Sequence, residues 1–267
     1  MSATHARKKP FLRLATAAVA MVAALGMAAC SGGASTSSSS SSSAQVGDRS
    51  PEQIKESGEI VIGIFSDKAP FGYIDADGKP AGYDVVYGDR IAADLGVTAK
   101  YVPVDAAART EVLASNKVDI TLANFTVTPE RAEKVDFANP YFKVSLGVVS
   151  PTSAEITDVS QLAGKTLIVT KGTTAEAYFE ANHPEVKLQK YDQYSDAYQA
   201  LEDGRGDAFS TDNTEVIAWA IQHPGFSVGI KSLGETSYIA AAVKKGNTAL
   251  LDWLNNQLVE LGKENFF

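Results

Sequence analysis

Strands and helices alternate twice along this chain, and this repeat limits the possible folds more than any other feature. Residues 59–65 place isoleucines at every second position, which predicts a strand. A helix capped by Asp84 is predicted next, with its apolar face at Tyr87, Ile91 and Leu95. Alternation of this kind favours an α/β fold with parallel strands joined by right-handed crossovers.

The same alternation is predicted again in the second half of the chain. Further strands are predicted at 100–104, 118–125, 166–169, 186–191 and 207–210, and further helices at 109–116, 174–181, 195–202 (capped by Ser195) and 213–222. Two extended segments, 143–150 and 238–243, flank the second unit and predict a two-stranded hinge. The expected lobes are 51–145 with 239–267, and 146–238, each built on a parallel-type sheet. The pattern also permits one continuous doubly wound sheet.

The N-terminus has the order of a secretory signal peptide. Basic residues precede an apolar stretch at 14–25, and small residues precede Cys30. A cysteine directly after Ala28 and Ala29 resembles the bacterial lipobox, in which the thiol receives a lipid. We expect a signal peptide over 1–29 and a lipidated cysteine with a Ser-rich flexible tether over 30–50, hence an extracytoplasmic, membrane-anchored protein. A cleaved signal with an unmodified thiol is the alternative.

Composition excludes several classes of function. The formal net charge of −8 argues against nucleic acid as a partner, because phosphate binding needs basic patches. The single cysteine permits no intramolecular disulfide, and the three histidines have no spacing typical of a zinc site. We therefore expect a monomer with no metal and no cofactor.

Polar side chains follow a predicted strand in the first half of the chain. In the segment NFTVTPER, Asn124 and Thr126 stand at the carboxyl end of the strand, where open α/β sheets bind ligands. Arg131 lies one helical turn further on, and its guanidinium could hold a carboxylate through two parallel hydrogen bonds. A surface arginine that caps a loop would give the same pattern.

Two similar signals follow strands in the second half. Thr173 and Thr174 lie at a strand–Gly–helix junction, where the amides of a helix N-terminus and the hydroxyls attract anions. Asp212 follows another strand, where a carboxylate could bind an ammonium group. Simple helix capping would explain each signal alone. Together, however, the signals are the complement of a zwitterionic α-amino acid in a cleft between two lobes.

These segments resemble the polar amino-acid-binding proteins of ABC importers. The resemblance rests on GxxxDKAPFGYIDADGKPAGYDV (63–85), SNKVDITLANFTVTPERAEKVDFANPYF (115–142), LIVTKGTTAEAYF (167–179) and RGDAFSTDNTEVIAW (205–219), and it covers nearly everything from Glu59 to Phe267. NKVDITLANFTVTPER, the preceding AAARTEVL, the DNT after Ser210 and LGKENFF look most like the cysteine-binding branch. The family has the type II periplasmic-binding fold, with its ligand between two lobes.

The resemblance implies a role for each candidate residue. Arg131 would hold the α-carboxylate with Thr126, Thr173 and Thr174, and Asp212 would take the α-ammonium. The remaining ligand-binding residues implied are Asn124 as a further contact, Phe71 and Tyr73 as pocket walls, and Arg109 at the side-chain end. Because members of this branch continue past the position of Phe267, we expect that the sequence is truncated there, the alternative being a protein without that final segment.

We therefore expect a non-enzymatic solute-binding lipoprotein whose partners are a free L-amino acid and an ABC permease. Cysteine is favoured, while cystine, glutamine or glutamate stay open. The alternative is a periplasmic dehydratase on the same fold, acting on a prephenate-like substrate, which would need a general acid or base in the cleft. A sensory domain would need a transmembrane helix and a signalling domain, so we do not expect this function.

Overall fold

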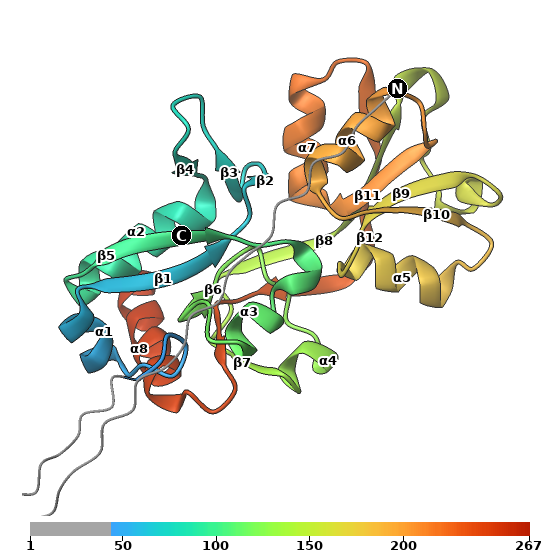
Figure 1. The fold of residues 1–267 in the computed structure, drawn as a ribbon. Helices are drawn as coiled ribbons and strands as arrows, with labels where there is room; N and C mark the ends of the chain where they lie inside the picture. The colour runs from blue at the N-terminus through green and yellow to red at the C-terminus, as the bar shows by residue number, and fades with distance from the viewer. Residues whose placement is uncertain (1–43) are drawn as a thin grey trace, which may run out of the picture. The chain divides into compact units, whose positions relative to one another are not determined.

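The protein is described by a computed structural model that covers residues 44–267. The predicted signal peptide and Cys30 lie outside the described residues. Two five-stranded sheets organise the fold (Figure 1). In spatial order the first contains β5 (Thr98–Pro103), β1 (Glu59–Ile64), β6 (Ile120–Thr121), β13 (Ala242–Lys244) and β7 (Val135–Phe137), and the second contains β10 (Lys187–Tyr191), β9 (Thr166–Thr170), β11 (Ala208–Asp212), β8 (Phe142–Pro151) and β12 (Phe226–Ile239).

Both sheets are mixed rather than parallel throughout, which corrects the expected parallel-type sheets. Three strands at one side of each sheet are parallel, as expected, but β13 and β8 pair antiparallel with their neighbours. Each of these two strands enters its sheet from the other lobe instead of from a crossover helix. It therefore arrives at the opposite end of the sheet and runs in the opposite direction.

Helices follow the strands as the alternation predicts, and the α/β class is confirmed. They are α1 (Pro51–Ser57), α2 (Tyr83–Leu95), α3 (Glu111–Ala114), α4 (Pro129–Ala132), α5 (Thr174–Asn182), α6 (Tyr194–Glu202), α7 (Asn213–Gln222) and α8 (Thr248–Glu264), with short 3-10 turns at Ala106–Ala108, Thr152–Ala154 and Val159–Leu162. A small antiparallel sheet of β2 (Asp67–Lys68), β3 (Gly72–Ile74) and β4 (Pro80–Ala81) follows β1. Within residues 44–267 no helix has the length and apolar content to cross a bilayer.

A pair of long strands joins the two sheets. β8 and β12 pair antiparallel, starting from Phe142 opposite Ile239, and run between the two groups of elements (Figure 1). A two-stranded hinge is thus present, as the sequence predicts, and its first strand matches the predicted segment 143–150. The second strand is Phe226–Ile239 instead of 238–243, because residues 242–244 continue into the first sheet as β13. We name the elements built on the first sheet, with α1–α4 and α8, lobe 1, and those built on the second sheet, with α5–α7, lobe 2.

The hydrophobic core also connects the two lobes. One cluster lies within lobe 1 around Ile62 and Ile91, and another lies within lobe 2 around Val169 and Phe179. A third continues from lobe 1 into lobe 2, and the Phe65 and Tyr194 rings meet there edge to face at 5.3 Å. The lobes therefore touch through side chains that are almost completely buried.

The chain just before α1 packs on lobe 1. Arg49 is 6% exposed, and its guanidinium pairs with the fully buried carboxylate of Asp119. The amide of Gly47 donates to the same carboxylate at 3.1 Å. Residues 47–50, which we expected to belong to a flexible tether, are instead part of the folded lobe.

Candidate ligand-binding site

Six of the predicted site residues lie around one small cavity at the meeting point of the lobes. It is lined by Arg109, Asn124, Thr126, Thr173, Thr174, Ala175, Tyr194, Thr211 and Asp212. The strand-end segments of β6 and β11 and the N-terminus of α5 converge there, as expected for open α/β sheets. Its volume of about 10 Å³ is that of a single water molecule. An amino acid can therefore enter only if the lobes separate.

A left-handed turn presents Asn124 to this cavity. Ala123 and Asn124 follow β6 with φ of 36° and 40°, a conformation that asparagine tolerates better than most residues. The Asn124 amide N–H donates to Asp84 at 2.9 Å, and its side-chain amide donates to Asp212 of lobe 2. Burial raises the pKa of Asp84 to about 6, although the Asn124 amide and the Tyr141 hydroxyl both favour its charged form.

Arg109 stabilises the same turn from the other side. Its guanidinium donates to the carbonyls of Ala106, Ala123 and Asn124 at 2.9, 3.2 and 3.2 Å, and to Gly172 of lobe 2 at 3.2 Å. Burial lowers the pKa of Arg109. Most of its donors are used by backbone carbonyls, so it lines the cavity mainly as a fixed positive charge.

Arg131 lies beside the cavity rather than in its lining. It donates to the Thr126 carbonyl at 2.7 Å and to the Gly172 carbonyl at 2.9 Å, so two guanidinium groups share the latter oxygen. Burial and the charge of Arg109 lower the pKa of Arg131 to about 9. Neither arginine forms an ion pair with a carboxylate in the described part of the chain.

The N-terminus of α5 supplies donors to the opposite wall. The Thr173 hydroxyl accepts from the Glu176 amide at 3.2 Å and donates to the Thr170 carbonyl at 2.7 Å, so Thr173 caps α5, as the simpler interpretation of this signal has it. Thr174 and Ala175 follow at the cavity. The first amides of a helix have no intrahelical acceptor, which makes this wall suited to an anion.

Asp212 does not cap the helix that it precedes. It occupies the N-cap position of α7, but its side chain accepts no hydrogen bond from that helix. Its carboxylate accepts from Asn124 and lies 3.8 Å from the Lys68 ammonium. Asp212 is 6% exposed, so it presents a buried negative charge between the lobes.

The two aromatic residues implied by the resemblance do not line the cavity. Phe71 is 2% exposed and packs against Tyr83 and Phe142 at ring distances of 6.3 and 5.8 Å. Tyr73 lies in β3 and is half-buried. The aromatic wall is Tyr194 instead, which the sequence analysis did not single out because it begins a helix rather than following a strand.

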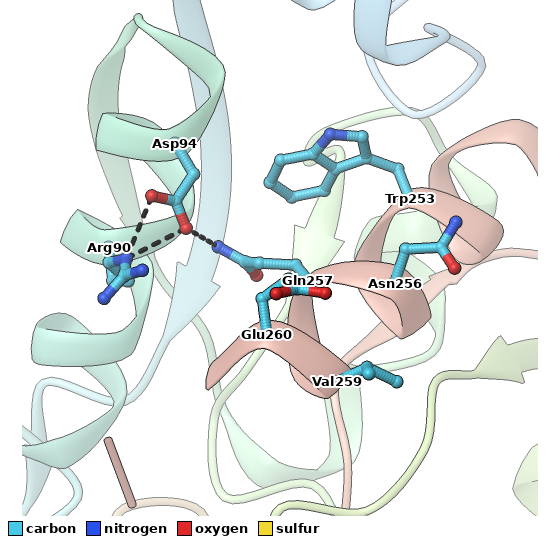
Figure 2. Close-up of a pocket in the computed structure, with 7 residues that line it drawn as sticks. All are labelled: Arg90, Asp94, Trp253, Asn256, Gln257, Val259 and Glu260. Carbon is cyan, nitrogen blue, oxygen red and sulfur yellow. Dashed lines mark hydrogen bonds and ion pairs between the residues drawn. The ribbon is translucent and has the colours of Figure 1, made fainter. Parts of the chain in front are cut away.

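A larger hollow lies elsewhere, between two helices of lobe 1. Its volume is about 510 Å³, and Figure 2 shows Arg90 and Asp94 on α2 facing Gln257 on α8. The polar groups here pair with one another: Arg90 Nε donates to Asp94 at 2.9 Å, and the Gln257 amide donates to Asp94 at 2.6 Å. None of the predicted site residues lines it.

Comparison with known proteins shows which family the chain belongs to. Residues 60–266 match the bacterial extracellular solute-binding proteins, family 3. The chain belongs to this family. The cavity between the lobes can therefore be compared with the binding sites of this family.

Two solved structures resemble this chain over most of its length. A solute receptor for L-cysteine from Neisseria gonorrhoeae is 51% identical, with a TM-score of 0.80 over 81% of this chain and 89% of that one. The cysteine-binding protein from Campylobacter jejuni is also 51% identical, with a TM-score of 0.79 over 81% of this chain and 88% of that one. The glutamine-binding protein of an ABC transporter from Bacillus subtilis (strain 168) is 29% identical over 78% of each chain.

Proposed function

We propose that this protein is the extracytoplasmic amino-acid-binding component of an ABC importer, and that L-cysteine is its ligand. The observation that carries the proposal is the charge arrangement around the cavity. Arg109 and Arg131 meet at one carbonyl without a carboxylate partner, and Asp212 lies across the cavity as a buried anion. A zwitterion compensates both charges at once.

The positive side receives the α-carboxylate. Burial disfavours the charged form of Arg131, and a bound anion would favour it again. Hydroxyls and amides at Thr173 and Thr174 add hydrogen bonds from lobe 2, and Thr126 adds one from lobe 1. Because the donors come from both lobes, the carboxylate stabilises the closed arrangement.

The negative side receives the α-ammonium. Asp212 is the carboxylate that lines the cavity, and the side-chain oxygen of Asn124 is buried without a hydrogen-bond partner in the described structure. An ammonium group placed between them would donate to both. Buried polar atoms without partners are uncommon, so this oxygen is a natural acceptor for a ligand.

Cysteine is favoured over larger amino acids by the similarity to other binding proteins. The relatives with the highest identity given above are named for cysteine, whereas the glutamine-binding relative is much less similar. Cystine, glutamine and glutamate are the alternatives that the same charge pattern accepts.

The dehydratase alternative needs a protonated carboxylic acid aimed at a leaving group. The carboxylate in the cavity lining, Asp212, accepts a hydrogen bond from Asn124 and lies 3.8 Å from the Lys68 ammonium, so it is held by protein partners on both sides. The arrangement therefore supports binding better than proton donation. Ligand recovered unchanged by mass spectrometry would agree with a binder, and turnover of a prephenate-like acid would favour the enzyme.

A lipid anchor at Cys30 completes the proposal. The Ala28-Ala29-Cys30 junction after an apolar stretch supports lipidation. The anchor would keep the binding lobes close to the permease, which would recognise their closed form.

Calorimetry with each common amino acid, under a non-thiol reductant, tests the ligand assignment. We expect L-cysteine to bind the wild type and Arg131→Ala to weaken it about 100-fold or more, because two hydrogen bonds to a charged group are lost. Lys134→Ala removes an exposed cation three residues along and serves as the matched control. Equal loss in both variants, or no binding of cysteine by the wild type, would contradict the proposal.

A further inference from the structure

Lys68 crosses from lobe 1 into lobe 2. It ends β2 of lobe 1, yet its side chain is 1% exposed and its ammonium lies among residues of α6, α7 and β11. It donates to the Thr211 hydroxyl at 3.1 Å, pairs with the Glu215 carboxylate and lies 4.0 Å from the centre of the Tyr194 ring. These partners all belong to lobe 2.

The three partners form a complete site for a cation. Glu215 is fully buried, and hydrogen bonds from Tyr198 at 3.2 Å and Thr211 at 2.8 Å fix its carboxylate. The face of the Tyr194 ring adds a cation–π contact. Burial alone would lower the pKa of Lys68, but Glu215 and Tyr194 outweigh it and hold the pKa above its usual range, so the ammonium is charged.

This cation site adjoins the ligand cavity. Tyr194 and Thr211 contact the Lys68 ammonium and also line the cavity. Asp212, the proposed partner of the ligand's ammonium, lies 3.8 Å from Lys68 Nζ. The lysine therefore packs directly against the cavity wall and fills the space beside it.

We propose that Lys68 is a specificity-determining residue, which occupies as an internal cation the subsite that a long cationic ligand side chain would otherwise enter. This inference rests on the proposed function, because it concerns the wall of the same cavity beside Asp212. With Lys68 present, a ligand with a basic side chain meets a filled space and a like charge. A short neutral side chain such as that of cysteine avoids both.

The same contacts explain why the lysine can stay there. Removing a buried charge from its partner leaves the partner unpaired, which is much less favourable than leaving the pair intact. Glu215 therefore keeps Lys68 in lobe 2 whenever the lobes are closed. Amino acids that would need this position must compete with a side chain tethered to the protein.

Three variants distinguish the effect of the space that Lys68 fills from the effect of the charge of Glu215. Lys68→Ala opens the subsite and leaves Glu215 as its carboxylate. Lys68→Ala with Glu215→Gln opens the subsite and removes the charge of its carboxylate. Lys68→Met with Glu215→Gln keeps the subsite filled by an uncharged side chain. Calorimetry measures the dissociation constants of L-cysteine, L-lysine, L-arginine and L-glutamine for each variant and the wild type.

We expect Lys68→Ala to improve the affinity for L-lysine or L-arginine, relative to cysteine, by roughly 10- to 100-fold, because the ligand's cation replaces the missing one. This gain should disappear when Glu215→Gln is added. If Lys68→Ala does not fold, the two double variants still test the space, since the alanine variant should accept L-glutamine better than the methionine variant does.

The inference is overturned if Lys68→Ala keeps the wild-type ratio of cysteine to basic amino acids, or if the two double variants bind L-glutamine equally. Failure of the proposed function has a different signature, because the wild type would then bind no amino acid. Wild-type binding of cysteine together with unchanged ratios in the variants rejects only the role of Lys68.

Discussion

Replacing Asp119 by asparagine should destabilise the protein strongly while leaving ligand affinity unchanged. The Asp119 carboxylate is fully buried and accepts from the Gly47 amide at 3.1 Å, the Val61 amide at 2.8 Å and two nitrogens of Arg49. Asparagine keeps the shape but removes the charge and turns one acceptor into a donor. The Arg49 guanidinium, 6% exposed, is then left without its carboxylate.

The magnitude follows from these contacts. Breaking a buried ion pair by removing one partner costs about 3–5 kcal/mol. A chain of this size loses about 2–4 °C in Tm for each kcal/mol, so the expected fall is about 6–20 °C. Gly47 and Arg49 supply three of the four hydrogen bonds to this carboxylate, so most of the loss depends on the packing of residues 47–50 on lobe 1.

Differential scanning calorimetry of the mature domain measures the effect. Asp48→Asn is the matched control, because Asp48 is the neighbouring carboxylate but is exposed and pairs with Lys244 at the surface. It should change the free energy of unfolding by no more than about 0.5 kcal/mol. Equal Tm values for Asp119→Asn and Asp48→Asn would refute the reasoning.

Three further outcomes are expected. Burial raises the pKa of Asp84 to about 6, above its unfolded value, so its contribution to stability falls as the pH rises from about 4 to 6, by on the order of 3 kcal/mol. Chemical denaturation across this window should show the wild type losing stability relative to Asp84→Asn, and a constant difference would contradict the assignment. Gly172→Ala should weaken cysteine binding and enlarge the radius of gyration in small-angle scattering, because the added Cβ would lie 2.5 Å from Ala107 Cα in lobe 1. Gly164→Ala is the control, because Gly164 has a similar positive φ but open space around it, so the effect of the clash can be distinguished from that of backbone strain. Cys30→Ser should release the protein from membranes on fractionation, and retention equal to the wild type would exclude the lipid anchor.

Local patterns predicted much of the fold correctly. The α7 helix spans Asn213–Gln222 as its pattern predicts, and the apolar face of α2 at Tyr87, Ile91 and Leu95 is buried. Helix and strand periodicity depends on neighbouring residues, so the sequence alone contains this information. The strand predicted at 118–125 is shorter in the structure. It ends at Thr121, because a left-handed turn follows, and Arg109 from another segment stabilises this turn.

Several side chains changed role because their partners lie far away in the sequence. Asp84 does not cap α2, since its carboxylate accepts from the amide of Asn124. Ser195 lies within the first turn of α6, not at its cap, and its amide and hydroxyl donate to Asp67 of lobe 1 at 3.1 and 3.3 Å. Both predictions were wrong for the same reason: capping was inferred from neighbours, and the real partner belongs to another element.

The sequence by itself therefore determined most of the strands and helices around the cavity, the two-lobed arrangement and most of the polar residues there, because strand ends gather at one edge of a sheet. It did not predict α1, α8 or the part of β12 before Tyr238. Only the tertiary structure decided which residues close the cavity. Phe71 is packed in the core, Tyr194 takes the place of the aromatic wall, and Lys68 reaches Glu215 in the other lobe. The contact between Lys68 and Glu215 joins residues more than a hundred positions apart, and it forms only when the two lobes meet.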